Sequence, residues 1–374
     1  MASTQQDRSR GRTTGRFPAP LAGTALGVVA LLSGCTSGQP ATSPSGSSSN
    51  PTATTAPTSS PGAGAVAIQT AYESVIRGAL PSVVQITTGS ALGSGIVLDD
   101  KGDIVTNAHV VGSAKQFQVT YADSTTPHAA TLVGSYLPDD LAVIRVGSPG
   151  RVHPATFADS SKVQVGEIVL ALGNPLGLSS SVTDGIVSAV GRTVSEPQSG
   201  DSPGATIPQA IQTSAAINPG NSGGALVDLS GRVVGIPTLA AVDPELNGSA
   251  APGIGFAIPS DVVTDIAGQL VKDGRVTNSH RAALRAELAT VADASGRPVG
   301  VGVVSVTPQG PADAAGIRAG DVIVSVAGHA VSDAQQVAAV LAGQKVGATI
   351  PVVITSPDSG RRTVQVTLGE LPGS

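Results

Sequence analysis

The sequence predicts a mostly β protein with two folded regions: a larger one built from two sets of about six short strands, and a smaller α+β module after it. Its 374 residues exceed the size of one ordinary domain, for which about 150 residues is typical. The 47 Gly and 27 Pro follow no three-residue period, so they indicate many turns between short strands. Hydrophobic residues make up 40% of the chain but aromatic residues only 2%, so the core must consist of Val, Ala, Leu and Ile.

The beginning of the chain is typical of an export signal. Residues 1–20 are polar and Arg-rich, and residues 21–34 are apolar. This apolar stretch is too short for a comfortable membrane span, which needs about 20 residues, but it suits the apolar part of a signal peptide. It ends in Leu32-Ser33-Gly34-Cys35, which resembles the lipobox of bacterial lipoproteins, and Cys35 is the only Cys. We expect a lipoprotein signal peptide over residues 1–34 and lipidation of Cys35; the alternative is an uncleaved short membrane anchor. Both alternatives place the rest of the chain outside the cytoplasm.

Residues 35–63 are expected to form a disordered tether. From residue 36 onward this tract has no charged residue and no apolar residue larger than Ala. It cannot bury enough apolar surface to offset the entropy lost on ordering. The tether would hold the folded regions near the membrane.

The first folded region begins with a predicted short helix at residues 67–80 and continues as strands separated by turn residues. The first set lies at residues 83–87, 95–98, 104–107, 116–121, 129–134 and 141–146, and the second at 167–172, 181–190, 209–213, 225–229, 233–237 and 255–258. Two such sets predict paired small barrels or sandwiches. A helix then follows, with Ser260 as its expected N-cap and Gly274 after its last turn.

The last 90 or so residues predict a compact α+β module with no catalytic constellation of its own. Strands are expected at residues 301–306, 321–326, 350–355 and 362–368, and helices at 311–315 and 332–341. Ser332 is the expected N-cap of the second of these helices.

Composition excludes several classes of function. The formal charge is −5 and aromatic residues are scarce, so no nucleic-acid partner is expected. One Cys allows neither an internal disulfide nor a thiolate zinc cluster. The five His residues never fall at His-x-x-x-His spacing, so we expect no metal and no other cofactor.

The pentapeptide from Gly220 to Gly224, Gly-Asn-Ser-Gly-Gly, is the most informative motif. A nucleophilic Ser needs a tight turn whose backbone N–H groups converge on the developing oxyanion, and flanking Gly residues permit that close approach. Alone, such a sequence is often only a turn. Here His109 lies at the end of a predicted strand and Asp140 lies at the start of another, and the order His, Asp, Ser is the chain order of chymotrypsin-like proteases.

The chain resembles the HtrA/DegP-type serine proteases with one PDZ domain. The matching stretches are residues 93–97 (GSGIV), 106–111 (TNAHVV), 140–143 (DLAV), 172–177 (LGNPLG), 216–226 (AINPGNSGGAL), 253–259 (GIGFAIP) and 310–323 (GPADAAGIRAGDVI). The resemblance implies a two-barrel chymotrypsin-like protease domain over residues 64–276 and an α+β PDZ domain over residues 281–372.

The resemblance also implies roles for single residues. Ser222 would be the nucleophile, His109 the general base and Asp140 the residue that orients His109. Asp140 is favoured over its neighbour Asp139 because the acid of the family directly precedes Leu-Ala. The N–H groups of Gly220 and Ser222, with Asn221 as a third candidate, would form the oxyanion hole.

Two departures from the family pattern stand out. Ser214 occupies a position where family members often carry Asp, so any activating contact through that carboxylate is in doubt. The PDZ carboxylate-binding loop should contain a Gly, but Ala283, Leu284, Arg285 and Ala286 stand there. Arg285 would either crowd the peptide's carboxylate or offer it a charge.

The expected function is an extracytoplasmic, ATP-independent serine endopeptidase that cleaves unfolded or damaged proteins. The alternative is a membrane-tethered PDZ adaptor or holdase with little proteolytic activity. The expected partners are unfolded proteins, C-terminal peptides at the PDZ domain and the membrane, and the resemblance raises a homotrimer as the assembly. Because residues 215–219 contain no acid, we expect a small apolar P1 residue rather than Lys or Arg. Residues 196–208 and 238–252 are the expected regulatory loops.

Overall fold

The computed structural model describes residues 63–373, except 90–91, 175–180, 197–203, 219 and 244–248. The predicted signal peptide, the predicted tether and Cys35 lie outside the described residues, as do parts of the two expected regulatory loops.

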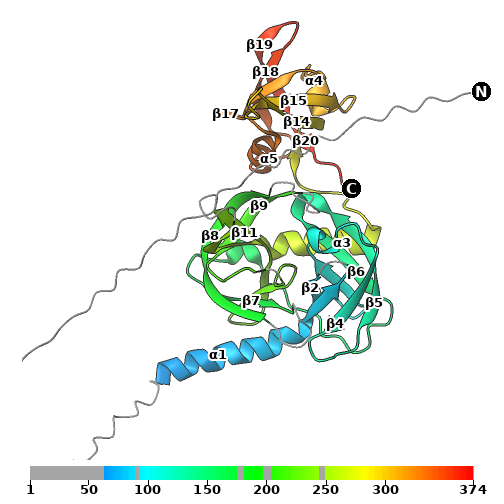
Figure 1. Ribbon diagram of the computed structural model, residues 1–374, viewed down its shortest axis with the longest axis vertical. Coiled ribbons are helices and arrows are strands. Elements are labelled where there is room, and N and C mark those ends of the chain that lie inside the picture. Colours follow the sequence, from blue (N-terminus) through cyan, green and yellow to red (C-terminus); the bar gives the residue numbers. More distant parts are fainter. Residues whose placement is uncertain are drawn as a thin grey trace, which may run out of the picture. The chain divides into compact units, whose positions relative to one another are not determined.

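The first set of strands closes into a barrel. Helix α1 (Ala63–Ala79) and the 3₁₀ turn η1 (Leu80–Ser82) precede it (Figure 1). The strands are β1 (Val83–Thr87), β2 (Leu92–Val97), β3 (Asp103–Thr106), β4 (Gln116–Tyr121), β5 (His128–Tyr136) and β6 (Leu141–Val146), and they pair in the order β1-β2-β3-β6-β5-β4. The alternation along β4 is clear, because Phe117, Val119 and Tyr121 are buried while Gln116 and Gln118 are exposed. The bounds of β1, β4 and β6 are those predicted from the sequence.

The second set closes into another barrel. Its strands are β7 (Ile168–Gly173), β8 (Ser181–Glu196), β9 (Ala205–Thr213), β10 (Ala225–Asp228), β11 (Val233–Asp243) and β12 (Ser249–Pro259), in the order β10-β11-β12-β9-β8-β7. Strands β8, β9, β11 and β12 are longer than predicted, because pairing continues past their apolar cores and through several register shifts. Barrels are therefore the correct choice between the two architectures left open by the sequence.

Helix α3 (Ser260–Asp273) contacts strands of both barrels. Its buried face consists of Val263, Ile266, Ala267 and Leu270, and these side chains join the core between the barrels. Gly274 adopts the left-handed conformation predicted for the residue after the last turn, with φ 68°, and its N–H donates to the carbonyl of Leu270.

The predicted N-cap of α3 is wrong. Pro259 is the capping position, and Ser260 lies in the first turn with its hydroxyl donating to the carbonyl of Ala158 at 2.7 Å. Ser260 is thus a buried contact between the helix and the segment that joins β6 to β7, rather than a cap.

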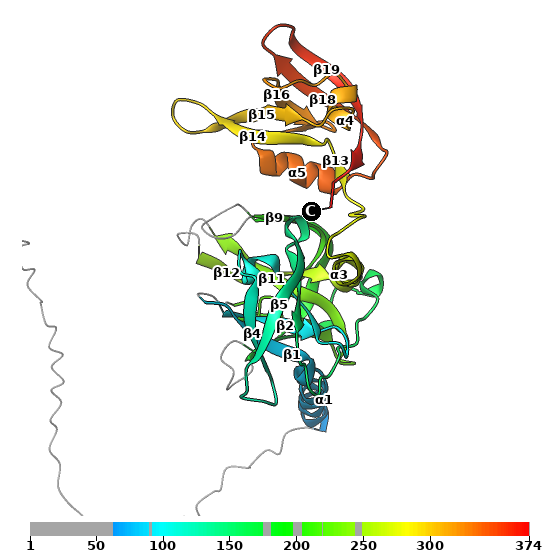
Figure 2. The same ribbon diagram turned by 90° about the vertical axis from the view of Figure 1, so that its right-hand side faces the viewer.

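The C-terminal module is an α+β unit with its own core. It contains β13 (Ala282–Ala283), β14 (Ala286–Ala292), β15 (Pro298–Val306), α4 (Pro311–Ala314), β16 (Val322–Val326), β17 (His329–Ala330), α5 (Ala334–Ala342), β18 (Thr349–Ser356), β19 (Gly360–Thr367) and β20 (Gly369–Glu370). The sheet order is β14-β15-β16-β18-β19, and β13 pairs with β20. Strands β14 and β15 form a hairpin, and α5 lies beside β14 (Figure 2). The mostly β fold class, a two-barrel domain followed by an α+β module, is confirmed.

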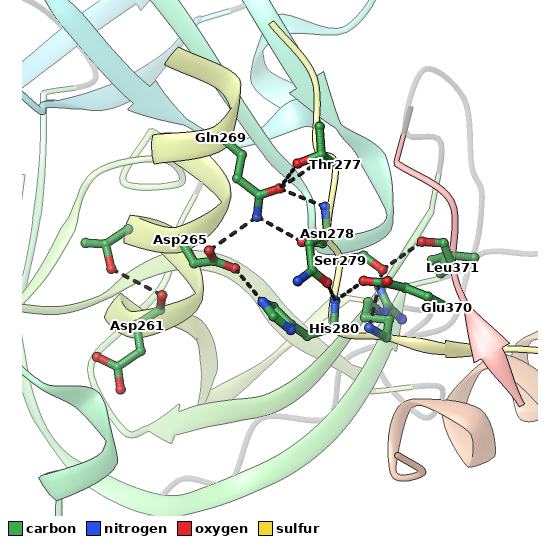
Figure 3. A network of polar contacts seen from close by, with 11 residues as sticks. Asp261, Asp265, Gln269, Thr277, Asn278, Ser279, His280, Glu370 and Leu371 are labelled. Atoms are coloured by element: carbon green, nitrogen blue, oxygen red, sulfur yellow. Dashed lines mark hydrogen bonds and ion pairs between the residues drawn. The ribbon is translucent and has the colours of Figure 1, made fainter. Parts of the chain in front are cut away.

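The segment between α3 and β13 is held by side-chain contacts (Figure 3). The Gln269 side-chain carbonyl accepts hydrogen bonds from the backbone N–H groups of Thr277 and Asn278, both at 2.9 Å. Its NH₂ group donates to the carbonyl of Asn278 at 2.8 Å. The hydroxyl of Ser279 donates to the carbonyl of Leu371 at 2.7 Å, so the linker is also tied to the end of the chain.

None of the helices in the described part of the chain is long and apolar enough to cross a membrane.

Candidate active site

Ser222 lies on a turn between β9 and β10 whose flanking positions require glycine. Gly220 has φ 112° and Gly223 has φ 79°, both in the region that favours glycine. A Cβ on Gly223 would lie 2.3 Å from the carbonyl oxygen of Ser94, and one on Gly224 would lie 2.2 Å from that of Leu172. The turn therefore packs directly on β2 of the first barrel and β7 of the second.

Asn221 stabilises this turn through hydrogen bonds to the residues that precede it. Its N–H donates to the carbonyl of Asn218 at 3.1 Å, its side-chain NH₂ donates to the carbonyl of Ala216 at 3.0 Å, and its side-chain carbonyl accepts from the N–H of Asn218 at 3.0 Å. Asn221 is 2% exposed. Because its N–H is already engaged, the assignment of Asn221 as a third oxyanion donor does not fit this geometry.

His109 and Asp140 form a direct pair in the first barrel. His109 lies in α2 (Ala108–Val111), directly after β3, and its Nδ1 is 2.8 Å from Oδ2 of Asp140. The backbone N–H of His109 donates to the other carboxylate oxygen at 2.9 Å. A carboxylate only accepts, so this contact places the neutral imidazole proton on Nδ1 and makes Nε2 the basic nitrogen.

The backbone around Asp140 is held as firmly as its side chain. Asp140 adopts the left-handed conformation, with φ 51° and ψ 43°, and its side chain is 3% exposed. Its carbonyl accepts from the N–H of Ala108 and from the side-chain NH₂ of Asn107, both at 3.0 Å. The turn before β6 and the turn after β3 are thus bonded to each other at the site of the His–Asp contact.

Thr238 of β11 connects Asp140 with Ser222, and the sequence did not predict it. Its hydroxyl donates to Oδ2 of Asp140 at 2.5 Å, and its carbonyl lies 3.5 Å from the Oγ of Ser222, a long contact. Thr238 is 5% exposed. The structure therefore brings together His109 and Asp140 by direct contact, and Asp140 and Ser222 through Thr238.

Asp139 has a different partner. Its carboxylate is 3% exposed and lies 2.8 Å from a guanidinium nitrogen of Arg281, which also donates to the carbonyl of Pro138. Burial raises the pKa of the Asp139 carboxyl to about 6, although the charge and hydrogen bond of Arg281 oppose that rise. Of the two adjacent acids, the one in contact with His109 is Asp140.

The segment before the glycine turn that carries Ser222 contains buried apolar side chains. Ala215 and Ile217 are buried, and a Cβ on Gly255 would lie 2.3 Å from Cγ1 of Ile217. Ser214, which stands where the family pattern has Asp, accepts the N–H of Ile186 with its hydroxyl at 3.0 Å, and its own N–H donates to the carbonyl of Ile186. The serine therefore pairs this segment with β8.

The predicted carboxylate-binding loop joins β13 to β14. Ala283 belongs to β13, Ala286 begins β14, and Leu284 is buried. Arg285 is exposed and adopts φ 55°, in the left-handed region that favours glycine. Its carbonyl accepts from the N–H of Thr307, and that of Leu284 accepts from the N–H of Ala312.

Within the described residues there is no group of three or more His, Cys, Asp or Glu that could hold a metal ion.

Comparison with known proteins identifies both regions. The trypsin-like peptidase domain family matches residues 93–236, and the PDZ domain family matches residues 302–355. The chain is 36% identical over 318 residues to the serine endoprotease DegS of Escherichia coli (strain K12). This alignment covers 81% of this chain and 87% of DegS. It is 38% identical over 315 residues to the serine protease PepD of Mycobacterium tuberculosis, covering 80% of this chain and 66% of that one.

Solved structures agree with these relatives. The HtrA-type protease AlgW with a decapeptide matches with a TM-score of 0.53 and 29% identity, over 80% of this chain and 99% of that one. The serine endoprotease from Yersinia pestis matches with a TM-score of 0.52 and 34% identity, over 80% and 98%. The two barrels, the glycine turn and the α+β module therefore identify the chain as a serine endopeptidase that belongs to the HtrA-type proteases with a C-terminal PDZ domain.

Proposed function

We propose that the protein is an extracytoplasmic, ATP-independent endopeptidase that cleaves unfolded or damaged proteins through a catalytic triad of His109, Asp140 and Ser222. The observation that carries the proposal is the set of contacts around Asp140, which bonds to His109 on one side and to Thr238, the neighbour of Ser222, on the other.

In the proposed mechanism, Ser222 attacks the carbonyl carbon of the scissile bond while Nε2 of His109 takes the hydroxyl proton. The imidazolium that forms is stabilised by Asp140, which also holds the ring in the required tautomer. The oxyanion receives hydrogen bonds from the N–H groups of Gly220 and Ser222. His109 then returns the proton to the leaving amine, and water hydrolyses the acyl-enzyme by the same steps.

The proposed site can be tested by covalent labelling. A fluorophosphonate probe should modify the wild-type protein on the peptide that contains Ser222 and should leave Ser222→Ala unlabelled. Ser230→Ala is the control, because Ser230 is an exposed turn serine close in sequence but outside the site. Absence of labelling in all three proteins would favour the tethered adaptor or holdase instead.

The extracytoplasmic setting and the anchor are part of the proposal. They rest on the apolar stretch at residues 21–34 and on Cys35 as the only Cys. Cys35→Ser should release the protein from membranes or stop its maturation, because the lipid would be attached through that thiol. A variant that still fractionates with membranes at unchanged mass would show an uncleaved anchor.

The PDZ domain is proposed to bind the C-terminal ends of substrates or regulatory peptides. The solved AlgW structures with a decapeptide and a tripeptide support this role. The exposed position of Arg285 favours pairing of its guanidinium with the peptide carboxylate over steric crowding. The segments at residues 196–208 and 238–252 were expected to be loops, but their described parts belong mostly to the ends of β8, β9, β11 and β12. Binding would act on the cleft through these strand ends, within a homotrimer.

Peptide activation has a direct test. A hydrophobic peptide with a free C-terminal carboxylate should raise the rate at which the full chain cleaves a short reporter peptide. The same peptide with a C-terminal amide is the control, because it lacks the charge that the loop would recognise. Equal rates with both peptides and without any peptide would leave the PDZ domain a role in holding substrate only.

A further inference from the structure

Ser94 lies in β2 of the first barrel but faces the nucleophile turn of the second. Its neighbours Gly93 and Gly95 face the first barrel, where a Cβ would lie 2.6 Å from Val110 and 2.7 Å from Ile104 respectively. Side chains alternate along a strand, so the side chain between these glycines points the other way. Ser94 is fully buried, and its side chain reaches across to the second barrel.

The hydrogen bonds of Ser94 bracket the turn. Its hydroxyl donates to the carbonyl of Gly220 at 2.5 Å, and its backbone N–H donates to the carbonyl of Ser222 at 3.1 Å. The same hydroxyl accepts from the N–H of Asn174 at 2.9 Å. An N–H group can only donate and a carbonyl can only accept, so the direction of every bond is fixed without ambiguity.

The backbone of Ser94 is itself held in place. Its carbonyl accepts from the hydroxyl of Thr106 at 2.6 Å, and Gly223 packs against the same oxygen. Thr106 directly precedes the turn that carries His109. One buried serine is therefore bonded to the strand before His109 and to both ends of the Gly220–Ser222 segment.

These contacts bear on the oxyanion hole. A hydrogen bond to the carbonyl of Gly220 fixes the peptide plane between Gly220 and Asn221, and one to the carbonyl of Ser222 fixes the plane between Ser222 and Gly223. The peptide between these two planes is the one that carries the N–H of Ser222. Glycine at φ 112° has no Cβ to restrict it, so its orientation depends on such external bonds. We propose that Ser94 is a positioning residue for catalysis, which orients the N–H of Ser222 toward the oxyanion by fixing the peptide planes on both sides of the peptide that carries this N–H.

This role of Ser94 rests on the proposed triad. The test below distinguishes failure of the Ser94 role from failure of the triad. Ser94→Ala should lower kcat about tenfold with KM almost unchanged, because the full loss of an oxyanion donor costs about 10² to 10³ and a loosened donor costs less. The affinity for a peptidyl boronate with a small apolar P1 residue should fall by the same factor as kcat/KM, since the boronate adduct places an oxygen in the oxyanion hole. Ser94→Cys, which keeps a weak donor of similar size, should recover part of both losses.

Ser260→Ala is the matched control, because it also removes a buried serine hydroxyl that donates to a carbonyl, away from the turn. It should lower the Tm to a similar extent as Ser94→Ala but leave kcat and boronate affinity unchanged. Equal kcat in wild type and Ser94→Ala, or equal losses in Ser94→Ala and Ser260→Ala, would overturn the proposal. Failure of both Ser94 variants to fold while Ser260→Ala folds would also overturn it, since Ser94 would then serve stability. If the wild type neither labels with fluorophosphonate nor cleaves substrate, the triad itself fails.

Discussion

At the scale of single residues, the site depends on small polar side chains that carry no recognisable sequence signal. His109 and Ser222 could be predicted because each lies in a motif whose composition is unusual. Thr238 could not, because a threonine in a predicted strand is ordinary and its role depends on where β11 lies relative to Asp140. The choice between Asp139 and Asp140 came from the resemblance, and the contact with His109 agrees with it.

Thr238→Val should lower kcat about tenfold while the fold is retained. Valine keeps the shape of threonine but removes the hydroxyl that donates to the buried Asp140, and a lost hydrogen bond to a charged group is worth about 1.5 to 3 kcal/mol. The measurement is kcat and KM for a reporter peptide, together with the Tm. Thr206→Val is the control, since Thr206 is also a buried strand threonine but bonds only to Ser195 among the described side chains. Equal activity of the two variants would contradict the role of Thr238.

At the scale of elements, apolar alternation predicted most strands, whereas the predicted N-caps of α3 and α5 were wrong. Strands β1, β4 and β6 have the predicted bounds because turn residues flank them closely. Strand β14 was not predicted, since most of its residues are exposed and its pairing with β15 provides the order. The N-cap of α5 is Asp333 and not Ser332, because the carboxylate of Asp333 accepts the N–H of Gln336. The side-chain carbonyl of Gln336 accepts the N–H of Ser332, the residue before the cap, so the N-cap lies one residue later than predicted.

Asp333→Ala should therefore destabilise the PDZ domain by about 1 kcal/mol, the usual cost of losing an N-cap side chain. Ser332→Ala should cost less, because it removes only a long hydroxyl contact with the Gln336 side-chain oxygen, at 3.3 Å, and retains the backbone N–H that bonds to the same oxygen at 2.9 Å. Chemical denaturation followed by circular dichroism would measure both changes. A larger loss in Ser332→Ala than in Asp333→Ala would restore the sequence-based assignment of the cap.

At the scale of the whole molecule, the start of the PDZ region is bonded to the turn that carries Asp140, the proposed catalytic acid. Arg281 directly precedes β13, and its guanidinium bonds to Asp139 and to the carbonyl of Pro138. The sequence could not predict this ion pair, because 142 positions separate its members and neither lies in a motif. Breaking a buried pair by removing one partner leaves an uncompensated charge.

The burial of Asp139 predicts a pH dependence of stability. The pKa of Asp139 in the folded protein is raised to about 6, so the folded state binds this proton more tightly than the unfolded state does. The contribution of Asp139 to the free energy of unfolding should therefore increase as the pH falls from about 7 to about 4. Relative to Asp139→Asn, the wild type should gain on the order of 1 to 3 kcal/mol over that range.

Denaturation of both proteins at several pH values would measure this difference. Arg281→Ala should steepen it, because the charge that favours ionised Asp139 is lost, whereas Arg285→Ala should leave it unchanged, since Arg285 is exposed and contributes nothing to the Asp139 pKa. A constant difference between wild type and Asp139→Asn across the range would contradict the buried, raised-pKa state of Asp139.

The central claim is that the three residues brought together around Asp140 form a working protease site. Its most direct test is the initial rate at which the full mature chain cleaves β-casein, compared among the wild type, Ser222→Ala and Ser230→Ala. The wild type and Ser230→Ala should cleave β-casein at equal rates, and Ser222→Ala should lose at least about 10³-fold in rate with an unchanged Tm. Cleavage by Ser222→Ala at the wild-type rate would contradict it.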